Sequence, residues 1–417
     1  MATKTIRDID VKGKKVLVRV DFNVPLADGK VTNDTRIVSA LPTIRALLDG
    51  GAALILMSHC GRPSGTGYEA EYSNKPAADR LSELLDKPAT IGEGDVGGEA
   101  DQATAAAMQP GDVLLLENVR FNAGENIADK AKKNPDKKLT AEQEALQQAF
   151  TDKLASLGEV YVNDAFGTCH RKHVSMYTLP KAIQAKGGPA VAGLLVEKEI
   201  KYLHEAVANP ARPFTAILGG AKVADKIQLI STLLEKVDTI LIGGAMAYTL
   251  LKAKGVSVGK SRVEQDQVDT MKDLLASAGD KIVLPGDHVA TDDFENGKPA
   301  EVDEVNIADT LMGMDIGPKT IEAFGKVIGE SKTIVWNGPM GVFEKRDYAK
   351  GTRAVAEALA RATSAGATSV IGGGDSAAAV EQMGLQERMT HISTGGGASL
   401  TYLEGKPMPP IEVLDKK

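Results

Sequence analysis

One stretch organises the prediction of the fold: Ser369-Val370-Ile371-Gly372-Gly373-Gly374-Asp375-Ser376-Ala377-Ala378-Ala379-Val380. Its apolar run is typical of a buried strand, and the alanine-rich run after the glycines is typical of a helix. Glycines let a ligand approach the backbone closely, and the first N–H groups of a helix favour an anion. Asp375 stands where it would cap the helix or hold a metal ion. Alone, the stretch fits either an ordinary strand-to-helix turn or a phosphate site.

The same strand–glycine–helix unit recurs through the second half of the chain. Glycine pairs follow the apolar runs 214–218 and 239–242, and a glycine triplet follows Ser393-Thr394, where we expect the last helix to begin. Repetition of this unit is typical of a doubly wound parallel sheet, which binds ligands outside the carboxyl ends of its strands. We therefore expect a nucleotide to approach the backbone there.

Lys222 and Lys226 follow the first of these glycine pairs. Residues four apart on a helix share one face, so we expect both amines on the same side. Solvated lysines are the alternative, but their place after a strand end favours contact with phosphate. The segment 255–261 resembles a P-loop with one residue missing between its glycines, and it follows no predicted strand, so we discount it.

The strand ends of the first half carry polar and basic residues instead. In an open parallel sheet these ends lie at one edge, so their side chains gather there. Arginine forks bind carboxylate and phosphate oxygens in pairs. The basic cluster expected at this edge comprises Arg36, His59, Arg62, Arg120, His170 and Arg171. The pattern predicts a site for a small polyanion.

Arg36 is unusual within this cluster because of its place in a helix. It falls in the first turn of a helix expected over 34–48, where a cation opposes the helix dipole. Either Arg36 is a solvated surface residue, or its side chain is aimed at a bound anion. The basic residues at the neighbouring strand ends favour the second interpretation.

Composition limits the class of protein. A chain of 417 residues suggests two domains, with a boundary at Lys186-Gly187-Gly188-Pro189 and a connector helix over 194–208. The net charge of −7 gives no general reason to expect nucleic acid as a partner. Two cysteines without a C-x-x-C pair fit a reducing compartment. Without a targeting signal or a run of membrane-spanning length, we expect a cytoplasmic protein.

The motifs together resemble those of a known family along essentially the whole chain. The matching segments are RVDFNVP (19–25), SHCGRP (58–63), ENVRF (117–121), DAFGT (164–168), GGAKVADK (219–226), WNGPMGVFE (336–344), GGGD (372–375) and STGGG (393–397). In this order they resemble the phosphoglycerate kinase family. Two departures are visible: Cys60 stands where the family usually has an aliphatic residue, and Ser376 where threonine is common.

The resemblance implies an architecture and a reaction. It implies two doubly wound, Rossmann-like α/β domains facing each other across a cleft and joined by the connector helix. Residues 1–188 would bind phosphoglycerate, 189–403 would bind nucleotide, and a tail over 404–417 would return to the first domain. The implied reaction is reversible phosphoryl transfer from 1,3-bisphosphoglycerate to Mg-ADP, giving 3-phosphoglycerate and Mg-ATP. ATP or ADP and Mg²⁺ are therefore the expected ligands of a monomer that binds neither nucleic acid nor membrane.

The resemblance also carries roles onto matching residues. The implied 3-phosphoglycerate ligands are Asp21, Asn23, Arg36, His59, Arg62, Arg120 and Arg171, to which the basic cluster adds His170. The implied nucleotide ligands are Lys222, Lys226, Gly243, Gly244, Gly313, Asn337, Glu344, Gly373, Gly374, Asp375, Ser376 and Gly396. Among these, Glu344 would bond the ribose, Gly313 and Gly243-Gly244 would line the adenine pocket, and Asp375 would hold magnesium. Arg36 and Lys222 would be the catalytic pair.

Two other functions remain open from the sequence. A kinase that forms the acyl phosphate of another small acid would keep the nucleotide half and differ in its acid. A non-catalytic nucleotide sensor would be expected to lack Lys222 or Asp375, and both are present.

Overall fold

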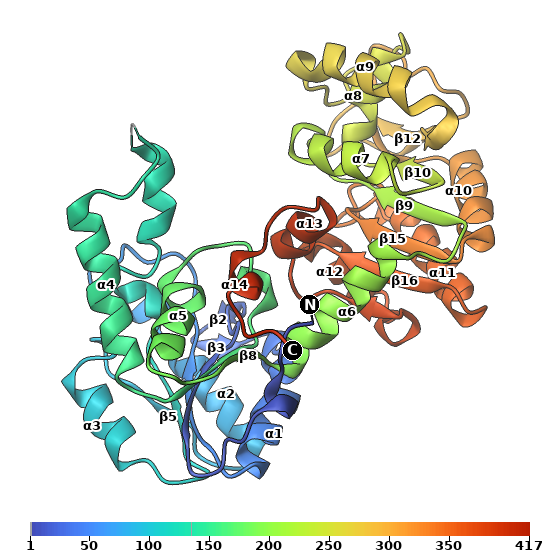
Figure 1. The fold of residues 1–417 in the computed structure, drawn as a ribbon. Helices are drawn as coiled ribbons and strands as arrows, with labels where there is room; N and C mark the ends of the chain where they lie inside the picture. Colours follow the sequence, from blue (N-terminus) through green and yellow to red (C-terminus); the bar gives the residue numbers. More distant parts are fainter. Residues whose placement is uncertain (1, 135) are drawn as a thin grey trace. The chain divides into compact units, whose positions relative to one another are not determined.

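The computed structural model describes residues 2–134 and 136–417. These residues form two compact units (Figure 1). Unit 1 runs up to Ile200 and also includes Pro407–Lys417, and unit 2 is Lys201–Lys406. Each unit is built around a six-stranded sheet. The predicted α/β class is confirmed. The assignment of phosphoglycerate binding to 1–188 and of nucleotide binding to 189–403 stays a prediction.

The sheet of unit 1 is parallel throughout, in the order β5-β6-β4-β1-β7-β8. Its strands are β1 (Lys15–Arg19), β4 (Ala53–Met57), β5 (Thr90–Ile91), β6 (Val113–Leu115), β7 (Val160–Asn163) and β8 (Ala190–Ala192). Every residue of β4 and β6 is buried. Strands covered on both faces require continuous apolar runs, which is why these segments were recognisable in the sequence.

Among the described residues of unit 1 up to β8, five α-helices and a small hairpin accompany the sheet, besides short 3₁₀ turns. The helices are α1 (Thr35–Asp49), α2 (Lys75–Leu85), α3 (Glu99–Ala107), α4 (Ala141–Ala155) and α5 (Thr178–Ala185). The hairpin is β2 (Leu26–Ala27) with β3 (Lys30–Val31). The C-terminal residues, including α14 (Pro409–Glu412), belong to this unit, where Lys4 N donates to Asp415 O at 2.8 Å. The expected helix over 194–208 is α6 (Leu194–Ala208).

The sheet of unit 2 is also parallel, in the order β11-β10-β9-β15-β16-β17. Its strands are β9 (Phe214–Leu218), β10 (Thr239–Ile242), β11 (Ile282–Val283), β15 (Thr333–Asn337), β16 (Thr368–Gly372) and β17 (His391–Ile392). Numbered along the chain, this order is 3-2-1-4-5-6, so the direction of winding reverses between β9 and β15. Ligands of doubly wound sheets bind at such a switch point.

Seven α-helices lie within unit 2 in addition to part of α6. They are α7 (Ile227–Leu234), α8 (Met246–Ala253), α9 (Val268–Ala278), α10 (Pro318–Glu330), α11 (Lys350–Ser364), α12 (Gly374–Gln382) and α13 (Gly397–Leu403). Because α14 follows α13, the helix after the glycine triplet is not the last one, contrary to expectation. Within the described part of the chain, no helix combines the length and apolar character needed to cross a membrane.

Unit 2 also carries a three-stranded antiparallel sheet that the sequence did not predict. Its strands, in the order β13-β12-β14, are β12 (His288–Thr291), β13 (Ala300–Val302) and β14 (Met312–Ile316). β13 is largely exposed, and β14 includes a glycine and an aspartate, so neither shows the apolar run used to find the other strands. The P-loop-like segment 255–261 follows α8 and no strand, as expected.

Candidate active site

In unit 1, Arg36 joins the loop that follows β1. From the first turn of α1 its Nη1 donates to Asp21 Oδ2 at 3.1 Å and to the carbonyl oxygen of Asn23 at 3.2 Å. Asn23 Oδ1 in turn accepts from Gly61 N at 2.9 Å, which ties the loops after β1 and β4 together. Arg36 is therefore held over the strand ends, although 37% of its side chain remains exposed.

His59 and Arg120 extend this group across the neighbouring strand ends. His59 Nδ1 lies 3.9 Å from Asp21 Oδ1, and Arg120 Nη1 donates to Gly61 O at 2.7 Å. Burial holds the pKa of His59 well below its usual value, and the charges of Arg19 and Arg120 lower it further. His59 is therefore a neutral imidazole at neutral pH in the absence of an anion.

Arg120 lies in a surplus of positive charge. Burial lowers its pKa, and the nearby charges of Arg19 and Arg171 add to the effect. Arg120 Nε is buried, and no hydrogen-bond partner meets it among the described residues. Buried polar groups are nearly always satisfied, so this atom points to a ligand. An anion would both neutralise the cations and accept from this donor.

His170 and Arg171 form the far side of the cluster. Arg171 Nε donates to His170 Nε2 at 3.1 Å, and burial with the adjacent Arg171 charge lowers the pKa of His170 to about 4. Arg171 Nη1 also donates to Asp129 Oδ2 at 3.1 Å, and His173 Nε2 lies 3.1 Å from the same oxygen. The hydrogen bond with His173, more than the Arg171 charge, lowers the pKa of Asp129 to about 2.

Arg19 is a further member of this site, one that the sequence patterns did not single out. It ends β1 with no exposed surface, and its Nη2 lies 3.2 Å from His59 Nδ1. Its Nε donates to Ser175 Oγ at 2.8 Å, and Ser175 Oγ donates to Glu125 Oε1 at 2.6 Å. An arginine inside an apolar strand run is a visible signal, because a buried charge needs partners. Asp129 and Glu125 do not lie in an apolar strand run, so no comparable sequence signal indicates that they belong to the site.

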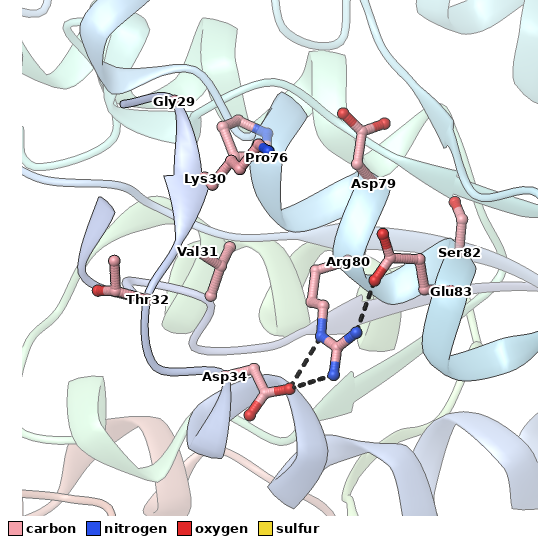
Figure 2. A pocket seen from close by; sticks show the side chains of 10 residues that line it. All are labelled: Gly29, Lys30, Val31, Thr32, Asp34, Pro76, Asp79, Arg80, Ser82 and Glu83. Atoms are coloured by element: carbon pink, nitrogen blue, oxygen red, sulfur yellow. Dashed lines mark hydrogen bonds and ion pairs between the residues drawn. The ribbon is translucent and has the colours of Figure 1, made fainter. Parts of the chain in front are cut away.

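The start of α1 is held from a neighbouring helix. Figure 2 shows Arg80 of α2 between Asp34, which precedes the first residue of α1, and Glu83 on its own helix. Arg80 Nη2 lies 2.8 Å from Asp34 Oδ2, and Arg80 Nη1 donates to Glu83 Oε2 at 2.6 Å. Asp34 makes no side-chain capping bond to α1. Arg80 therefore holds the side chain of Asp34, two residues before Arg36.

Not every predicted residue of unit 1 is tied into this network to the same degree. Asp21, Asn23, Arg36, His59 and Arg120 are linked directly or through Gly61. The charge of Arg171 acts on Arg120, and Arg171 is in turn hydrogen-bonded to His170. Arg62 is exposed in the loop after β4.

In unit 2 the loops after β9 and β15 meet at the switch point of the sheet. Gly219 N donates to Asn337 O at 2.9 Å, and Gly220 N donates to Pro339 O at 3.1 Å. Gly338 has a φ of +97°, and a Cβ there would overlap the Gly219 carbonyl. Only glycine fits this approach, which brings bare backbone to the predicted nucleotide site.

Lys226 connects this point with the end of β16. Its Nζ donates to Asn337 Oδ1, and Asn337 Nδ2 donates to Gly372 O at 2.8 Å. Burial lowers the pKa of Lys226 to about 8, against the opposing charge of Asp375. A bound phosphate would supply the anion that this amine lacks.

The expectation that Lys222 and Lys226 share a helical face is wrong. Lys222 is exposed in the loop after β9, Lys226 ends a 3₁₀ turn over Ala224–Lys226, and α7 begins only at Ile227. The helical pattern breaks at Lys226, whose φ of −122° departs from α-helical values, while the N–H of the buried Val223 is bonded to the carboxylate of Glu264. Lys222 therefore lies in an irregular loop and Lys226 at the end of a 3₁₀ turn, so helical spacing does not place their side chains on one face.

The glycine triplet after β16 leads into α12. The residue before the helix is Gly373, with a φ of +94°, so Asp375 lies in the first turn and does not cap the helix. Ser376 is buried, and its Oγ accepts from Gly338 N at 2.6 Å. Asp375 is exposed beside Lys226, and a single carboxylate next to phosphate oxygens is a usual donor set for Mg²⁺. The residue present therefore fits the metal.

The remaining predicted residues lie around these loops. Gly244 N donates to Met340 O at 2.9 Å, and a Cβ on Gly243 would lie 2.6 Å from Met340 Sδ. Gly313 belongs to β14, where Val342 N donates to Met314 O at 3.0 Å and so places the loop of Glu344 alongside.

Gly396 lies farther along the chain, at the start of α13. It precedes the helix with a φ of +43°. Three residues earlier, Ser393 N donates to Ile371 O at 2.8 Å, which holds this segment beside the end of β16, where the glycine triplet 372–374 begins.

Comparisons with known proteins agree on one family. Residues 6–406 match the family model of phosphoglycerate kinase. The chain is 52% identical over 417 residues to the phosphoglycerate kinases of Lactobacillus acidophilus and Lactobacillus delbrueckii subsp. lactis, with full coverage of both chains in each case.

Solved structures give the same result. The phosphoglycerate kinase of Coxiella burnetii superimposes with a TM-score of 0.83 at 36% identity, covering 99% of this chain and 98% of that one. The enzyme of Pyrococcus horikoshii superimposes with a TM-score of 0.82 at 33% identity, covering 98% of each chain.

Proposed function

Because the chain belongs to the phosphoglycerate kinase family and has that activity in glycolysis, we propose how its two units divide the reaction. The basic cluster of unit 1 binds 3-phosphoglycerate or 1,3-bisphosphoglycerate. The strand ends of unit 2 bind the nucleotide, with ATP or ADP as the co-substrate. The observation that carries the first assignment is Arg120, whose pKa is lowered by burial and by the charges of Arg19 and Arg171, and whose buried Nε has no hydrogen-bond partner among the described residues.

The acid is selected by charge and by shape. A substrate with a phosphate at one end and a carboxylate at the other matches a cluster that offers several guanidinium groups. Arg36, held by Asp21 beside the start of α1, is proposed to face the reacting carboxylate. Arg120, His170 and Arg171 are proposed to bind the distal phosphate.

The transfer itself requires no general base. The attacking carboxylate of 3-phosphoglycerate is ionised at neutral pH, and its oxygen forms a bond to the γ-phosphorus of ATP. The bond from this phosphorus to the β–γ bridging oxygen breaks, and its electron pair remains on ADP. The protein therefore contributes positioning and charge neutralisation. We assign these tasks to Arg36 on the acid side and to Lys222 on the nucleotide side.

The other residues of unit 2 hold the nucleotide. Lys226 faces the phosphates beside α12, whose N-terminal N–H groups favour an anion. Glu344 is assigned to the ribose, and Gly243, Gly244 and Gly313 to the base. Asp375 would hold Mg²⁺, which supplies neutralisation of the phosphate charge when bound.

Because the two groups of ligands lie in different units, reaction requires the units to bring them together and to exclude water. We propose that both substrates together cause this closure. Small-angle scattering should show a smaller radius of gyration with both ligands than with either alone, and an unchanged radius would contradict the proposal.

The direct test of the assignment measures ADP released from Mg-ATP. Release should require 3-phosphoglycerate, should not occur with acetate or glycerate at the same concentration, and should disappear in Lys222→Ala. Release that proceeds with acetate would instead assign the site to another acid.

A further inference from the structure

Glu264 contacts the nucleotide loop from outside every motif identified in the sequence. It lies in the connection between α8 and α9, 41 residues after Val223. Its Oε2 accepts hydrogen bonds from the backbone N–H groups of Val223 and, at 3.2 Å, of Ala224. These are the two residues that directly follow Lys222.

Glu264 is itself fixed by the scaffold. Its backbone N donates to Thr249 Oγ1 at 3.1 Å, and Thr249 is buried within α8. The carboxylate therefore reaches the loop from a segment whose backbone is hydrogen-bonded to a buried residue of α8.

The backbone N–H of Val223, to which Glu264 is bonded, requires a hydrogen-bond acceptor. Val223 has no exposed surface, and a buried N–H without a partner is strongly unfavourable. On the other side of Lys222, Gly220 N is held by the carbonyl of Pro339. Lys222 thus lies on a short span whose two ends are fixed, while its own side chain is exposed.

We propose that Glu264 is a positioning residue, which sets the direction of Lys222 toward the nucleotide phosphates by holding the two N–H groups after it. The proposal rests on the assignment of Lys222 to the nucleotide. It accounts for how a lysine in an irregular loop, outside any helix, keeps a defined position.

An alternative role for the Glu264 contact predicts the opposite change in nucleotide affinity. If Glu264 occupied the place of a nucleotide phosphate on these N–H groups, its removal would strengthen nucleotide binding. The burial of Val223 favours the positioning role, since the N–H there needs an acceptor in every state.

The experiment compares Glu264→Ala with Glu264→Gln by calorimetry with Mg-ADP and, separately, with 3-phosphoglycerate. Alanine removes both hydrogen bonds, so Mg-ADP binding should weaken about tenfold, the effect of losing hydrogen bonds to a charged group. The glutamine oxygen can still accept from both N–H groups, so this variant should stay within about threefold of the parent. Affinity for 3-phosphoglycerate should be unchanged in both, because its proposed site lies in unit 1, and a thermal unfolding transition like that of the parent would show that unit 2 remains folded.

Two further variants make the result specific. Asp266→Ala removes an exposed carboxylate two residues away, whose side chain accepts from the neighbouring Gln267, and should leave Mg-ADP binding unchanged. Glu264→Ala added to Lys222→Ala should cause no further loss, because the proposed effect passes through Lys222.

The outcomes separate the inference from its premise. Unchanged or tighter Mg-ADP binding in Glu264→Ala, with a clear loss in Lys222→Ala, would overturn the positioning role alone. Unchanged binding in Lys222→Ala would overturn the assignment of Lys222 to the nucleotide and the inference with it. An equal loss in the single Glu264→Ala chain and in the Lys222→Ala background would show a merely structural contribution and overturn the proposal.

Discussion

Arg36 and Lys222 are the two cations to which we assign the transferring phosphoryl group, and they are held in different ways. The Arg36 side chain is bonded to Asp21 and to the Asn23 carbonyl. Lys222 is exposed, and the bonds that fix it are made by the backbone on either side. The difference extends through both units: the site in unit 1 consists of paired side chains, whereas that in unit 2 is shaped by close-packed glycine backbone.

This contrast indicates where each unit obtains its selectivity. Side chains that carry their own counter-ions, as Arg171 does with Asp129, match the charges of one small acid. In unit 2 the first N–H groups of a helix, as at the start of α12, favour a phosphate without selecting the rest of the molecule. Substitutions should therefore act on unit 1 through charge and on unit 2 through backbone geometry.

The largest effect is expected from truncating either assigned cation. Arg36→Ala and Lys222→Ala should each lower kcat by about a thousandfold, as loss of a phosphoryl-transfer arginine does. Arg45→Ala is the matched control, because Arg45 lies on the same helix and donates to Leu84 O, away from the strand ends. Near-parental turnover in both truncations would refute the assignment.

Adding one methyl group at Gly338 should weaken the nucleotide site, which is shaped by backbone, and leave the acid site, which is made of side chains, unchanged. In Gly338→Ala the Cβ would overlap the Gly219 carbonyl, so the free energy of unfolding should fall by about 1–3 kcal/mol. Mg-ADP affinity should fall as well, while 3-phosphoglycerate affinity stays. Gly366→Ala is the control, since Gly366 also has a φ of +97° but a Cβ there would meet no atom within 4 Å. Equal effects of both substitutions, measured by denaturant titration and calorimetry, would show that φ alone matters.

Lys226 should make nucleotide binding dependent on pH. Its pKa is about 8 without ligand, and a phosphate favours the charged amine and raises that value. Between pH 8 and the pKa of the complex, Mg-ADP binding should therefore take up a proton, approaching one per site near pH 9. Calorimetry in buffers of different ionisation enthalpy measures this uptake. Lys226→Arg, which stays charged, should abolish it, and uptake that persists would assign the proton elsewhere.

The smallest effect is expected from Asp129, the counter-ion of Arg171. Asp129→Asn removes a negative charge beside the proposed phosphate position, so 3-phosphoglycerate should bind about threefold more tightly, the scale of a partly exposed ion pair. Weaker binding in a calorimetric titration would instead make Asp129 necessary for the placement of Arg171.

The same substitution should alter acid stability. The folded pKa of Asp129 is about 2 against a usual 3.8, so the unfolded chain binds the proton first. Stability from this carboxylate is present above about pH 4 and is lost as the pH falls toward 2. Asp129→Asn should therefore lose less stability over that window in acid denaturation, and an identical loss would contradict the lowered pKa.

The sequence predicted much of the fold for a simple physical reason. Strands buried on both faces, such as β4 and β9, are continuous apolar runs, and the polar residues that follow them fall at one edge of each sheet. The strands β12, β13 and β14 were missed because they lie in a small antiparallel sheet without such runs.

The candidate site was predictable only as far as its signals are local. Asp21, Arg36, His59 and Arg120 follow or adjoin strand ends, and the structure brings them together. Asp129 and Glu264 act through partners 42 and 41 residues away, and no local pattern marks such contacts. The helical spacing of Lys222 and Lys226 failed because the chain there forms a 3₁₀ turn over Ala224–Lys226 and α7 begins only at Ile227.

Acid and nucleotide are assigned to different units, so each ligand, given alone, should bind without the residues that hold the other. Calorimetry of Arg36→Ala and Lys222→Ala with each ligand alone separates the two sites. Arg36→Ala should weaken 3-phosphoglycerate binding and leave Mg-ADP unchanged, and Lys222→Ala should do the reverse. If either substitution weakened both ligands equally, or if their effects were exchanged, the division of the reaction between the units would be contradicted.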